Sequence, residues 1–181
     1  MGVVRFVSRA IRRPLRVGAP APTLRGTARF MVEVTGVGRG DLVVDAGTGT
    51  GVVALEAARL GCEVVAVDLD EELLKVARER AREEGLDDRI EFVRSDVREL
   101  PDLVDRADAV ISTVPIKTLP DPGRVFEAYA ESVRPGGRVV QLTHWPGRFR
   151  RAVEGVPLRV ERRYLRWVHL VPGFIFVCRR E

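Results

Sequence analysis

The sequence predicts an α/β fold in which a mostly parallel sheet carries helices on both faces. Two observations support this class. From residue 41 onward, short apolar runs of the kind found in buried strands alternate with amphipathic helical stretches, which is the pattern of repeated β-α-β units. Three glycines follow the first of these runs, at a turn from strand to helix. Because 181 residues are about the size of one domain, we expect residues 1–181 to form a single domain.

The first 28 residues are predicted to form a basic amphipathic arm. Residues 3–13 place apolar side chains on one side of a helix and arginines largely on the other, and Pro14 ends this helix. Such a helix can lie in a membrane interface, pack against the body of the protein or bind RNA phosphates, and the sequence leaves these roles open. After a connector rich in proline and glycine, a second helix is expected over residues 24–37, with Thr23 as its N-cap.

The glycines of the first loop stand at alternate positions, 47, 49 and 51, after a predicted strand over residues 42–46. A residue without a Cβ tolerates positive φ and lets the backbone approach a ligand closely, so we predict a nucleotide-cofactor loop here. A dinucleotide fingerprint would need its third glycine at position 52, and a P-loop would end in Gly-Lys-Ser or Gly-Lys-Thr. The loop therefore fits neither phosphate-binding motif well.

The remaining elements follow from hydrophobic periodicity and from glycines that end helices. Helices are expected over residues 52–60 and 70–84, and the apolar stripe of the second consists of Leu73, Leu74, Val76, Ala77 and Ala81. The other predicted elements are strands over residues 64–67, 90–96, 109–112 and 138–143, a helix over residues 123–133, and a C-terminal antiparallel hairpin of residues 158–170 and 174–178. We expect Pro172 and Gly173 to form the turn of this hairpin.

Acidic residues stand at the ends of three successive strands: Asp45, Asp68 and Asp96. In open parallel sheets, ligands bind beyond the carboxyl ends of the strands, where the strand order reverses. Asp68 follows Gly47 by twenty-one residues, the spacing at which a carboxylate accepts hydrogen bonds from ribose hydroxyls. Helix capping explains any one of these acids, but it does not explain their joint spacing.

The glycine loop resembles motif I of the class I S-adenosylmethionine-dependent methyltransferases, an acidic residue followed by three alternating glycines, here Asp45 to Gly51. The resemblance implies S-adenosylmethionine as cofactor and places the Ser-Asp pair that ends at Asp96 beside the adenine. The two cysteines, Cys62 and Cys178, lack the spacing of a metal framework, so we expect no metal. The cofactor-binding residues that it implies are Asp45, Gly47, Thr48, Gly49, Gly51, Asp68, Leu69, Asp96, Val97 and Ser112.

Three further segments are similar to the bacterial phospholipid N-methyltransferases, which methylate phosphatidylethanolamine. Residues 112–116, Ser-Thr-Val-Pro-Ile, resemble that family's Ser-Ser-Leu-Pro-Leu acceptor loop, and residues 13–23 and 135–144 resemble its pre-motif segment and its fifth strand. The resemblance implies N-methylation of a phospholipid head-group amine. We expect Ser112, Thr113 and His144 to be the catalytic residues. Enzymes that methylate base nitrogens have an amide or acid first and an aromatic last in this loop, and neither is present here.

The chain departs from that family at His144, where the family has tyrosine, and at residues 169–173, which read His-Leu-Val-Pro-Gly. Two readings of His144 stay open: it orients or deprotonates an amine, or it makes a structural hydrogen bond at a strand end. Trp145 likewise either faces a cationic ammonium or packs under a loop.

Charge is segregated along the chain, with a net charge of +7 in residues 1–32, −11 in residues 33–133 and +8 in residues 134–181. Basic ends favour a polyanionic partner, and we expect an anionic membrane surface, with nucleic acid as the alternative. RNA methylation, or methylation of a small molecule with the arm as a lid, remains the alternative function. The two isolated cysteines and the absence of a bilayer-spanning apolar run predict a cytoplasmic protein. The basic amphipathic helix near the N-terminus predicts that this protein is peripheral at the membrane.

Overall fold

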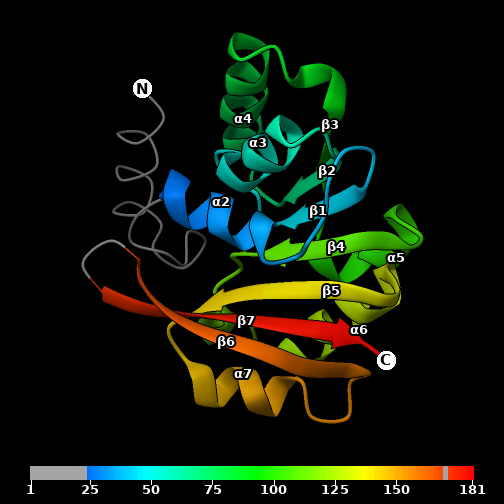
Figure 1. Ribbon diagram of the computed structural model, residues 1–181, viewed down its shortest axis with the longest axis vertical. Coiled ribbons are helices and arrows are strands. Elements are labelled where there is room, and N and C mark those ends of the chain that lie inside the picture. The colour runs from blue at the N-terminus through cyan, green and yellow to red at the C-terminus, as the bar shows by residue number, and fades with distance from the viewer. Residues whose placement is uncertain (1–23, 169–170) are drawn as a thin grey trace.

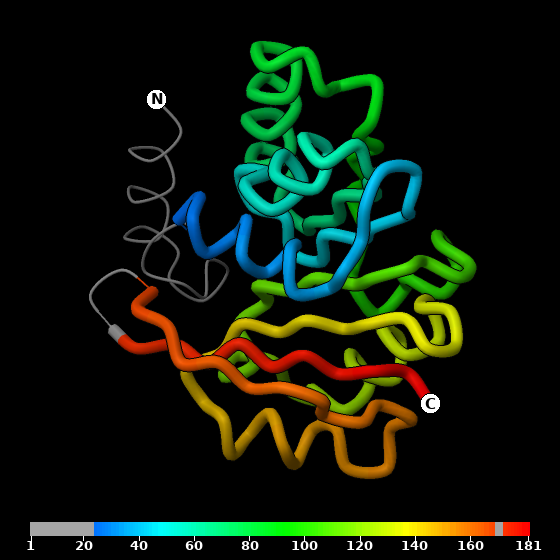
Figure 2. Tube along the Cα trace, in the orientation of Figure 1, coloured from blue at the N-terminus to red at the C-terminus, as the bar shows by residue number. Residues whose placement is uncertain are grey.

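The computed structural model describes residues 24–168 and 171–181, and it contains one seven-stranded sheet with helices on both faces (Figures 1 and 2). The α/β class and the C-terminal antiparallel strands are therefore as predicted. In chain order the elements are α2 (Arg25–Glu33), β1 (Leu42–Ala46), α3 (Val52–Arg59), β2 (Glu63–Asp68), α4 (Glu71–Glu83), β3 (Ile90–Arg94), α5 (Leu100–Leu103), β4 (Ala107–Ser112), α6 (Pro122–Ser132), β5 (Val133–Thr143), α7 (Pro146–Ala152), β6 (Leu158–Val168) and β7 (Val171–Arg180). Short 3-10 turns cover Asp87–Arg89, Val97–Glu99 and Ile116–Thr118.

The strand order is β3-β2-β1-β4-β5-β7-β6, and strands β1 to β5 all run parallel to one another. The chain moves outward from β1 to β3 and then returns to the other side of β1, so the order reverses between β1 and β4. The carboxyl ends of the parallel strands therefore meet at one edge of the sheet, where ligands bind in folds of this kind. Strand β7 is antiparallel to both β5 and β6.

Each face of the sheet has its own hydrophobic core. Helices α2 and α3 pack on one face, with Ala28, Met31 and Leu55 fully buried. Helices α5, α6 and α7 cover the other face, where Phe149 stacks on Phe176 of β7 with ring centroids 4.1 Å apart. Each aromatic side chain buried in this way contributes about 1.5–3 kcal/mol by removal from water.

The predicted amphipathic helix over residues 70–84 is confirmed as α4, and all five residues of its predicted apolar stripe are buried. Asp70 caps the helix because its carboxylate accepts a hydrogen bond from the backbone N–H of Glu72, at 3.0 Å. Gly85 follows the helix with a φ of +64°, a left-handed conformation that glycine adopts without strain.

Helix α2 is shorter than predicted, since it ends at Glu33 rather than at residue 37. The Thr35 hydroxyl donates to the carbonyl oxygen of Val32, and Gly36 turns the chain with a φ of +76°. Residues 25–28, predicted as part of the arm, form the first turn of α2. The rest of that arm, including the helix over residues 3–13 and the Thr23 cap, lies outside the described residues.

The predicted turn at Pro172 and Gly173 is wrong. Both residues lie within β7, where Pro172 pairs with Trp167 and Gly173 pairs with Arg166. Proline is tolerated there because it lies near the start of a strand, where one missing N–H costs little. Pairing across the sheet outweighs the local turn propensity of the Pro-Gly pair.

The first and last described parts of the chain meet on the α2 side of the sheet. The ring of Phe30 in α2 contacts the ring of Tyr164 in β6 edge to face, with centroids 5.0 Å apart. The guanidinium of Arg166 lies 3.7 Å from the centroid of the Phe30 ring. Arg138 of β5 donates to the backbone carbonyl of Thr35 at 2.8 Å, so α2 contacts β6 and the turn that follows α2 is bound to β5.

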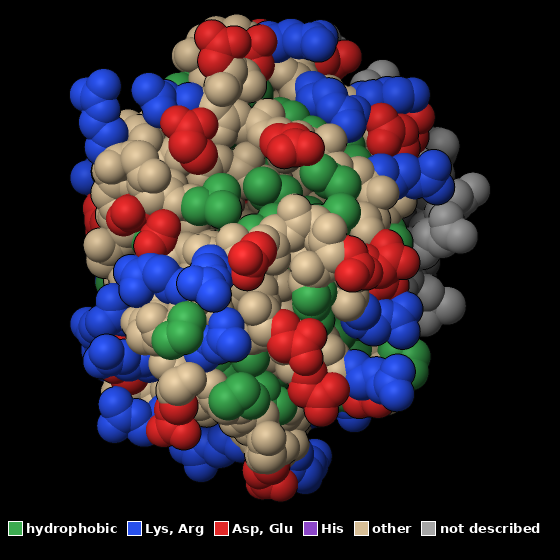
Figure 3. All heavy atoms as spheres, turned by 90° about the vertical axis from the view of Figure 1, so that its right-hand side faces the viewer, with side chains coloured by type: hydrophobic (Ala, Val, Ile, Leu, Met, Phe, Trp, Pro, Cys, Tyr) green, Lys and Arg blue, Asp and Glu red, His purple; other side chains and the backbone are tan. Residues whose placement is uncertain are grey.

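Within the described ranges, no helix is long and apolar enough to cross a membrane. Cys62 and Cys178 are both buried and free, and burial raises the pKa of the Cys62 thiol to about 11. Figure 3 looks onto the edge where the parallel strands begin, and acidic and basic side chains are mixed over it. Such mixing is typical of a solvated surface.

Candidate cofactor and acceptor site

The glycine loop after β1 has the backbone conformation that the sequence predicts. Gly47, Gly49 and Gly51 have φ values of +76°, +56° and +80°. Gly47 also allows a close approach, because a Cβ built on it would lie 2.6 Å from Cγ2 of Val114 in the loop after β4. The first of the three glycines therefore brings the loops after β1 and β4 into contact.

Asp45, at the end of β1, is buried beneath this loop and joins it to helix α3. Its Oδ2 accepts hydrogen bonds from the Thr48 hydroxyl at 2.6 Å and from the backbone N–H of Ala54 at 2.9 Å. Its Oδ1 is buried without a hydrogen-bond partner. Desolvation raises the pKa of this carboxyl from 3.8 to about 7. An unpaired buried acceptor fits a site that receives a ligand with hydrogen-bond donors.

Asp68, at the end of β2, faces the same loop. Its carboxylate accepts from the backbone N–H of Gly49 at 2.8 Å and of Asp70 at 2.9 Å. Burial raises the pKa of this carboxyl, while the two backbone hydrogen bonds oppose the rise. Each oxygen keeps a further acceptor position, as binding of a ribose diol requires. Leu69, which follows, is 64% exposed and offers an apolar surface beside the loop.

Asp96, after β3, forms hydrogen bonds with Arg98, two residues further along the chain. The guanidinium of Arg98 donates to both of its oxygens, at 3.0 and 2.7 Å, and the backbone N–H of Arg98 donates at 2.9 Å. The side-chain hydrogen bond from Arg98 lowers the pKa of Asp96. Asp96 therefore caps the turn Val97–Glu99, in which Val97 is buried, so a capping role accounts for its position locally.

The loop after β4 is fixed from below by buried hydroxyls. Ser112 is completely buried, and its Oγ lies 3.0 Å from the Tyr129 hydroxyl and accepts from the backbone N–H of Val114 at 3.2 Å. The Thr113 hydroxyl donates to the carbonyl oxygen of Gly47 at 3.1 Å. In these contacts Ser112 and Thr113 hold the loop, and their catalytic role stays a prediction.

Two further residues hold the same loop from β5 and α7. The amide Nε2 of Gln141 donates to the carbonyl oxygen of Val114 at 3.1 Å. Arg148 donates to the carbonyl oxygens of Ile116 and Leu119, at 3.0 and 2.7 Å. Sequence reasoning did not assign Arg148 or Tyr129 to the site. Gln141, the only glutamine of the chain, lies within residues 135–144, one of the segments that resemble the phospholipid N-methyltransferases.

His144 and Trp145 follow β5 at the same edge of the sheet. Nδ1 of His144 lies 3.0 Å from the carbonyl oxygen of Pro172. A carbonyl oxygen only accepts, so Nδ1 carries the proton, and in the neutral ring Nε2 is left as the proton acceptor. The ammonium of Lys117, in the loop after β4, lies 5.0 Å from the centroid of a Trp145 ring, so this tryptophan already binds a cation.

The sheet has a glycine loop at the point where its strand order reverses and carboxylates after β1 and β2. These features indicate an enzyme that binds a nucleotide cofactor. No group of residues able to hold a metal ion occurs in the described part of the chain. Residues 43–137 match the methyltransferase domain family, and the chain belongs to that family. Its family and fold are those of the class I S-adenosylmethionine-dependent methyltransferases.

Among curated proteins, the chain is 31% identical over 117 residues to the ubiquinone/menaquinone biosynthesis C-methyltransferase UbiE of Pectobacterium carotovorum. This match covers 63% of the chain and 47% of the relative, so the chain spans about half the length of the curated relatives that it matches.

Two solved structures share the fold. TrmN from Thermus thermophilus is 28% identical, with a TM-score of 0.80 over 98% of this chain and 52% of that one. Geranyl diphosphate C-methyltransferase from Streptomyces coelicolor, solved with S-adenosyl-L-homocysteine, is 18% identical, with a TM-score of 0.73 over 86% and 79% of the two chains. The second likeness shows the fold alone.

We predict that Gly47→Ala destabilises the protein more than Gly40→Ala does. Gly40 has a similar φ of +85° but open space around it, so its replacement costs only the backbone strain of about 1–2 kcal/mol. The Cβ that Gly47→Ala introduces would in addition overlap Val114, at a further cost of about 1–3 kcal/mol. Chemical denaturation measures both, and Val114→Ala in the Gly47→Ala background should restore part of the loss. Equal losses for the two single variants would contradict this contact.

Asp45 makes the stability of the unliganded protein depend on pH. Its pKa is higher in the folded chain than its ordinary value of 3.8, so its contribution is fully present below that value. The contribution is lost as the pH rises through the folded value of about 7. We expect Asp45→Asn to flatten this fall in the free energy of unfolding between pH 4 and pH 8, which urea titrations at several pH values measure. Parallel curves for the two proteins would show that Asp45 does not titrate in this range.

Replacement of Asp68 by alanine should weaken cofactor binding by roughly 1.5–3 kcal/mol through loss of hydrogen bonds to a charged group. Calorimetric titration with S-adenosylmethionine would then give a dissociation constant about 10- to 150-fold higher. Asp87→Ala, at an exposed position outside the site, is the matched control. An unchanged dissociation constant in Asp68→Ala would remove Asp68 from the cofactor site.

Proposed function

We propose that this protein transfers a methyl group to the amine of a phospholipid head group at the surface of a membrane. The observation that carries the proposal is the hydrogen bond between Nδ1 of His144 and Pro172, which leaves Nε2 to accept a proton at the acceptor end of the sheet. An amine must lose its proton before it can act as a nucleophile, and a histidine fixed in one tautomer suits this task. We assign this proton transfer to His144.

The bound cofactor supplies an electrophilic methyl group. The protein's own residues then have to bind and orient the acceptor and exclude water, and orientation of this kind contributes up to about 7–11 kcal/mol. The loop after β4 suits this task because Thr113, Gln141 and Arg148 hold it from three sides. We assign the cofactor to the glycine loop, Asp45, Asp68 and Leu69, and the acceptor to the space beside Thr113 and His144.

Trp145 supports an amine acceptor in particular. Its ring binds the ammonium of Lys117, and a tryptophan face that attracts one cation also attracts a protonated or methylated head-group amine. Lys117 is exposed, so its flexible side chain can leave the ring when an acceptor enters. The similarity of residues 112–116 to the acceptor loop of the phospholipid N-methyltransferases agrees with this assignment.

RNA methylation is the second candidate, and the basic surface of the C-terminal strands favours it. Residues 134–181 carry eleven arginines and three acids, a balance that attracts phosphate groups in general. The UbiE relatives are named for C-methylation in ubiquinone and menaquinone biosynthesis, so a small acceptor that is methylated on carbon is a third possibility.

Methyl-labelled S-adenosylmethionine distinguishes these candidates. The purified protein is incubated with the label and either phosphatidylethanolamine vesicles, phosphatidylcholine vesicles, total RNA or a small-molecule extract. We expect label in the organic phase only with phosphatidylethanolamine, since phosphatidylcholine has the same phosphate but no amine left to methylate. Label in RNA, or in an organic species other than a phospholipid, would overturn the lipid assignment and leave the methyltransferase class intact.

The role of His144 is tested by His144→Ala in the same assay. Loss of a general base lowers the rate by about 100- to 10,000-fold. Cofactor affinity should stay unchanged, because His144 lies on the acceptor side of the site. A variant that keeps its full rate on phosphatidylethanolamine would show that the hydrogen bond to Pro172 is structural only.

A further inference from the structure

Strand β6 is the edge strand of the sheet, and two large apolar side chains on it are exposed to solvent. Trp167 is 72% exposed and Leu165 is 64% exposed. A solvated strand face normally carries polar residues, because exposed apolar side chains on an edge strand promote association with other surfaces. These two side chains therefore mark an interaction surface.

Both side chains lie on the side of the sheet that α7 partly covers. Alternate residues of a strand share one face, and Arg163, Leu165 and Trp167 stand opposite Phe176, Phe174 and Pro172 of β7. Phe176 is buried against α7, which fixes the side to which this set belongs. Helix α7 has only seven residues and leaves the end of β6 uncovered. We define the β6 face as Arg163, Leu165 and Trp167 together with Arg150 of α7.

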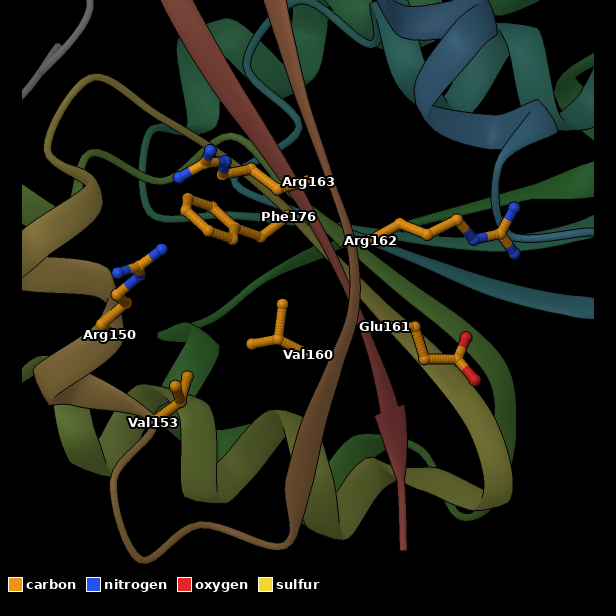
Figure 4. Close-up of a pocket in the computed structure, with 7 residues that line it drawn as sticks. All are labelled: Arg150, Val153, Val160, Glu161, Arg162, Arg163 and Phe176. Carbon is orange, nitrogen blue, oxygen red and sulfur yellow. The ribbon is translucent and has the colours of Figure 1, made fainter.

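The β6 face carries positive charge beside a groove with apolar walls. Figure 4 shows Arg150 and Arg163 on either side of Phe176 in a groove of about 510 Å³, with Val153 and Val160 below them. Glu161 points to the other side of the strand, where its carboxylate binds Arg138 at 3.2 Å. The β6 face thus combines two arginines with exposed apolar side chains and includes no acid.

The same face leads to the acceptor end of the site. Leu165 is in register with Phe174, which pairs with Thr143 at the end of β5. Trp167 pairs with Pro172, whose carbonyl oxygen binds His144. Since neighbouring strands are about 4.8 Å apart, the β6 face begins about 10 Å from the end of β5. A surface docked on the β6 face would therefore lie beside the acceptor loop.

We propose that the β6 face docks on an anionic lipid bilayer, with Trp167 and Leu165 in the interface and Arg150 and Arg163 on lipid phosphates. Tryptophan is enriched at membrane interfaces because its ring is apolar and its N–H is polar, and arginine binds phosphate through two parallel hydrogen bonds. The docking deepens the proposed function, on which it rests for the identity of the substrate, since it would hold the acceptor site at the head groups.

Charge and side-chain type favour a bilayer over two other occupants. A second copy paired along β6 would bring Arg159, Arg162, Arg163 and Arg166 of two chains together, and like charges oppose such pairing. Single-stranded RNA could stack one base on Trp167, but Leu165 and Val160 offer no ring for the next base. Aliphatic and aromatic side chains next to arginines match the head-group region of a bilayer.

Tryptophan fluorescence tests the docking directly, because Trp145 and Trp167 are the only tryptophans of the chain. In Trp145→Phe all emission comes from Trp167. We expect vesicles of phosphatidylglycerol and phosphatidylcholine to shift this emission to shorter wavelength, and brominated acyl chains to quench it. Pure phosphatidylcholine vesicles should give no shift. These vesicles contain no methylatable amine and the cofactor is omitted, so the result does not depend on the proposed reaction.

Vesicle sedimentation with matched variants of the full chain gives the second measurement. We expect two double variants to lower the partition coefficient for vesicles at least tenfold each. One combines Leu165→Ser with Trp167→Ser, and the other combines Arg150→Ala with Arg163→Ala. The controls are Leu103→Ser, an exposed leucine of α5, and Arg159→Ala, an exposed arginine at the other end of β6. Both controls should bind as the unchanged protein does. Circular dichroism and thermal melting confirm that every variant is folded.

Three outcomes would overturn the proposal. Vesicle binding without a shift of Trp167 emission would assign the binding to another part of the chain. Loss of RNA binding in the arginine variant, with no vesicle binding by the unchanged protein, would assign the β6 face to nucleic acid. A sedimentation coefficient that rises with protein concentration and falls in the Leu165 and Trp167 variant would assign it to a second copy.

Discussion

The contact between Gly47 and Val114 is the constraint on which the site depends. It brings the loop after β1, assigned to the cofactor, against the loop after β4, assigned to the acceptor, with no room for a Cβ between them. Asp45 fixes the first loop from below, through Thr48 and the start of α3. Donor and acceptor loops are thus set relative to each other by packing, which is the preorganisation that a displacement reaction needs.

The second loop is held by residues that are distant in sequence. Ser112 and Tyr129 anchor its start in the core, Gln141 holds its middle from β5, and Arg148 holds its end from α7. Most of these hydrogen bonds end on backbone carbonyl oxygens, so they fix the path of the main chain through the loop. A loop supported in this way can present different acceptor-binding side chains on the same frame.

The sequence predicted the α/β class, the five parallel strands and the positive φ of the glycine loop. These features depend on neighbouring residues, since the hydrophobic period determines the type of element and a missing Cβ permits positive φ. Helix α7 was not predicted, since its seven residues include three arginines and no full apolar stripe. Pro172 and Gly173 were assigned to a turn because local propensity cannot report cross-strand pairing. Tyr129 and Arg148 were missed for a similar reason: their contacts exist only once α6 and α7 have packed.

The attachment of α2 to β6 has a consequence for how the protein is made. Phe30 contacts Tyr164 and Arg166, and the carbonyl oxygen of Thr35 is bound by Arg138, so an early helix completes its packing against late strands. During synthesis from the N-terminus, these partners leave the ribosome only near the end of translation. The contacts of Phe30 cannot form before these partners are synthesised, and pairing across more than a hundred residues is slow to form. Nascent chains that stop before β6 therefore expose Phe30.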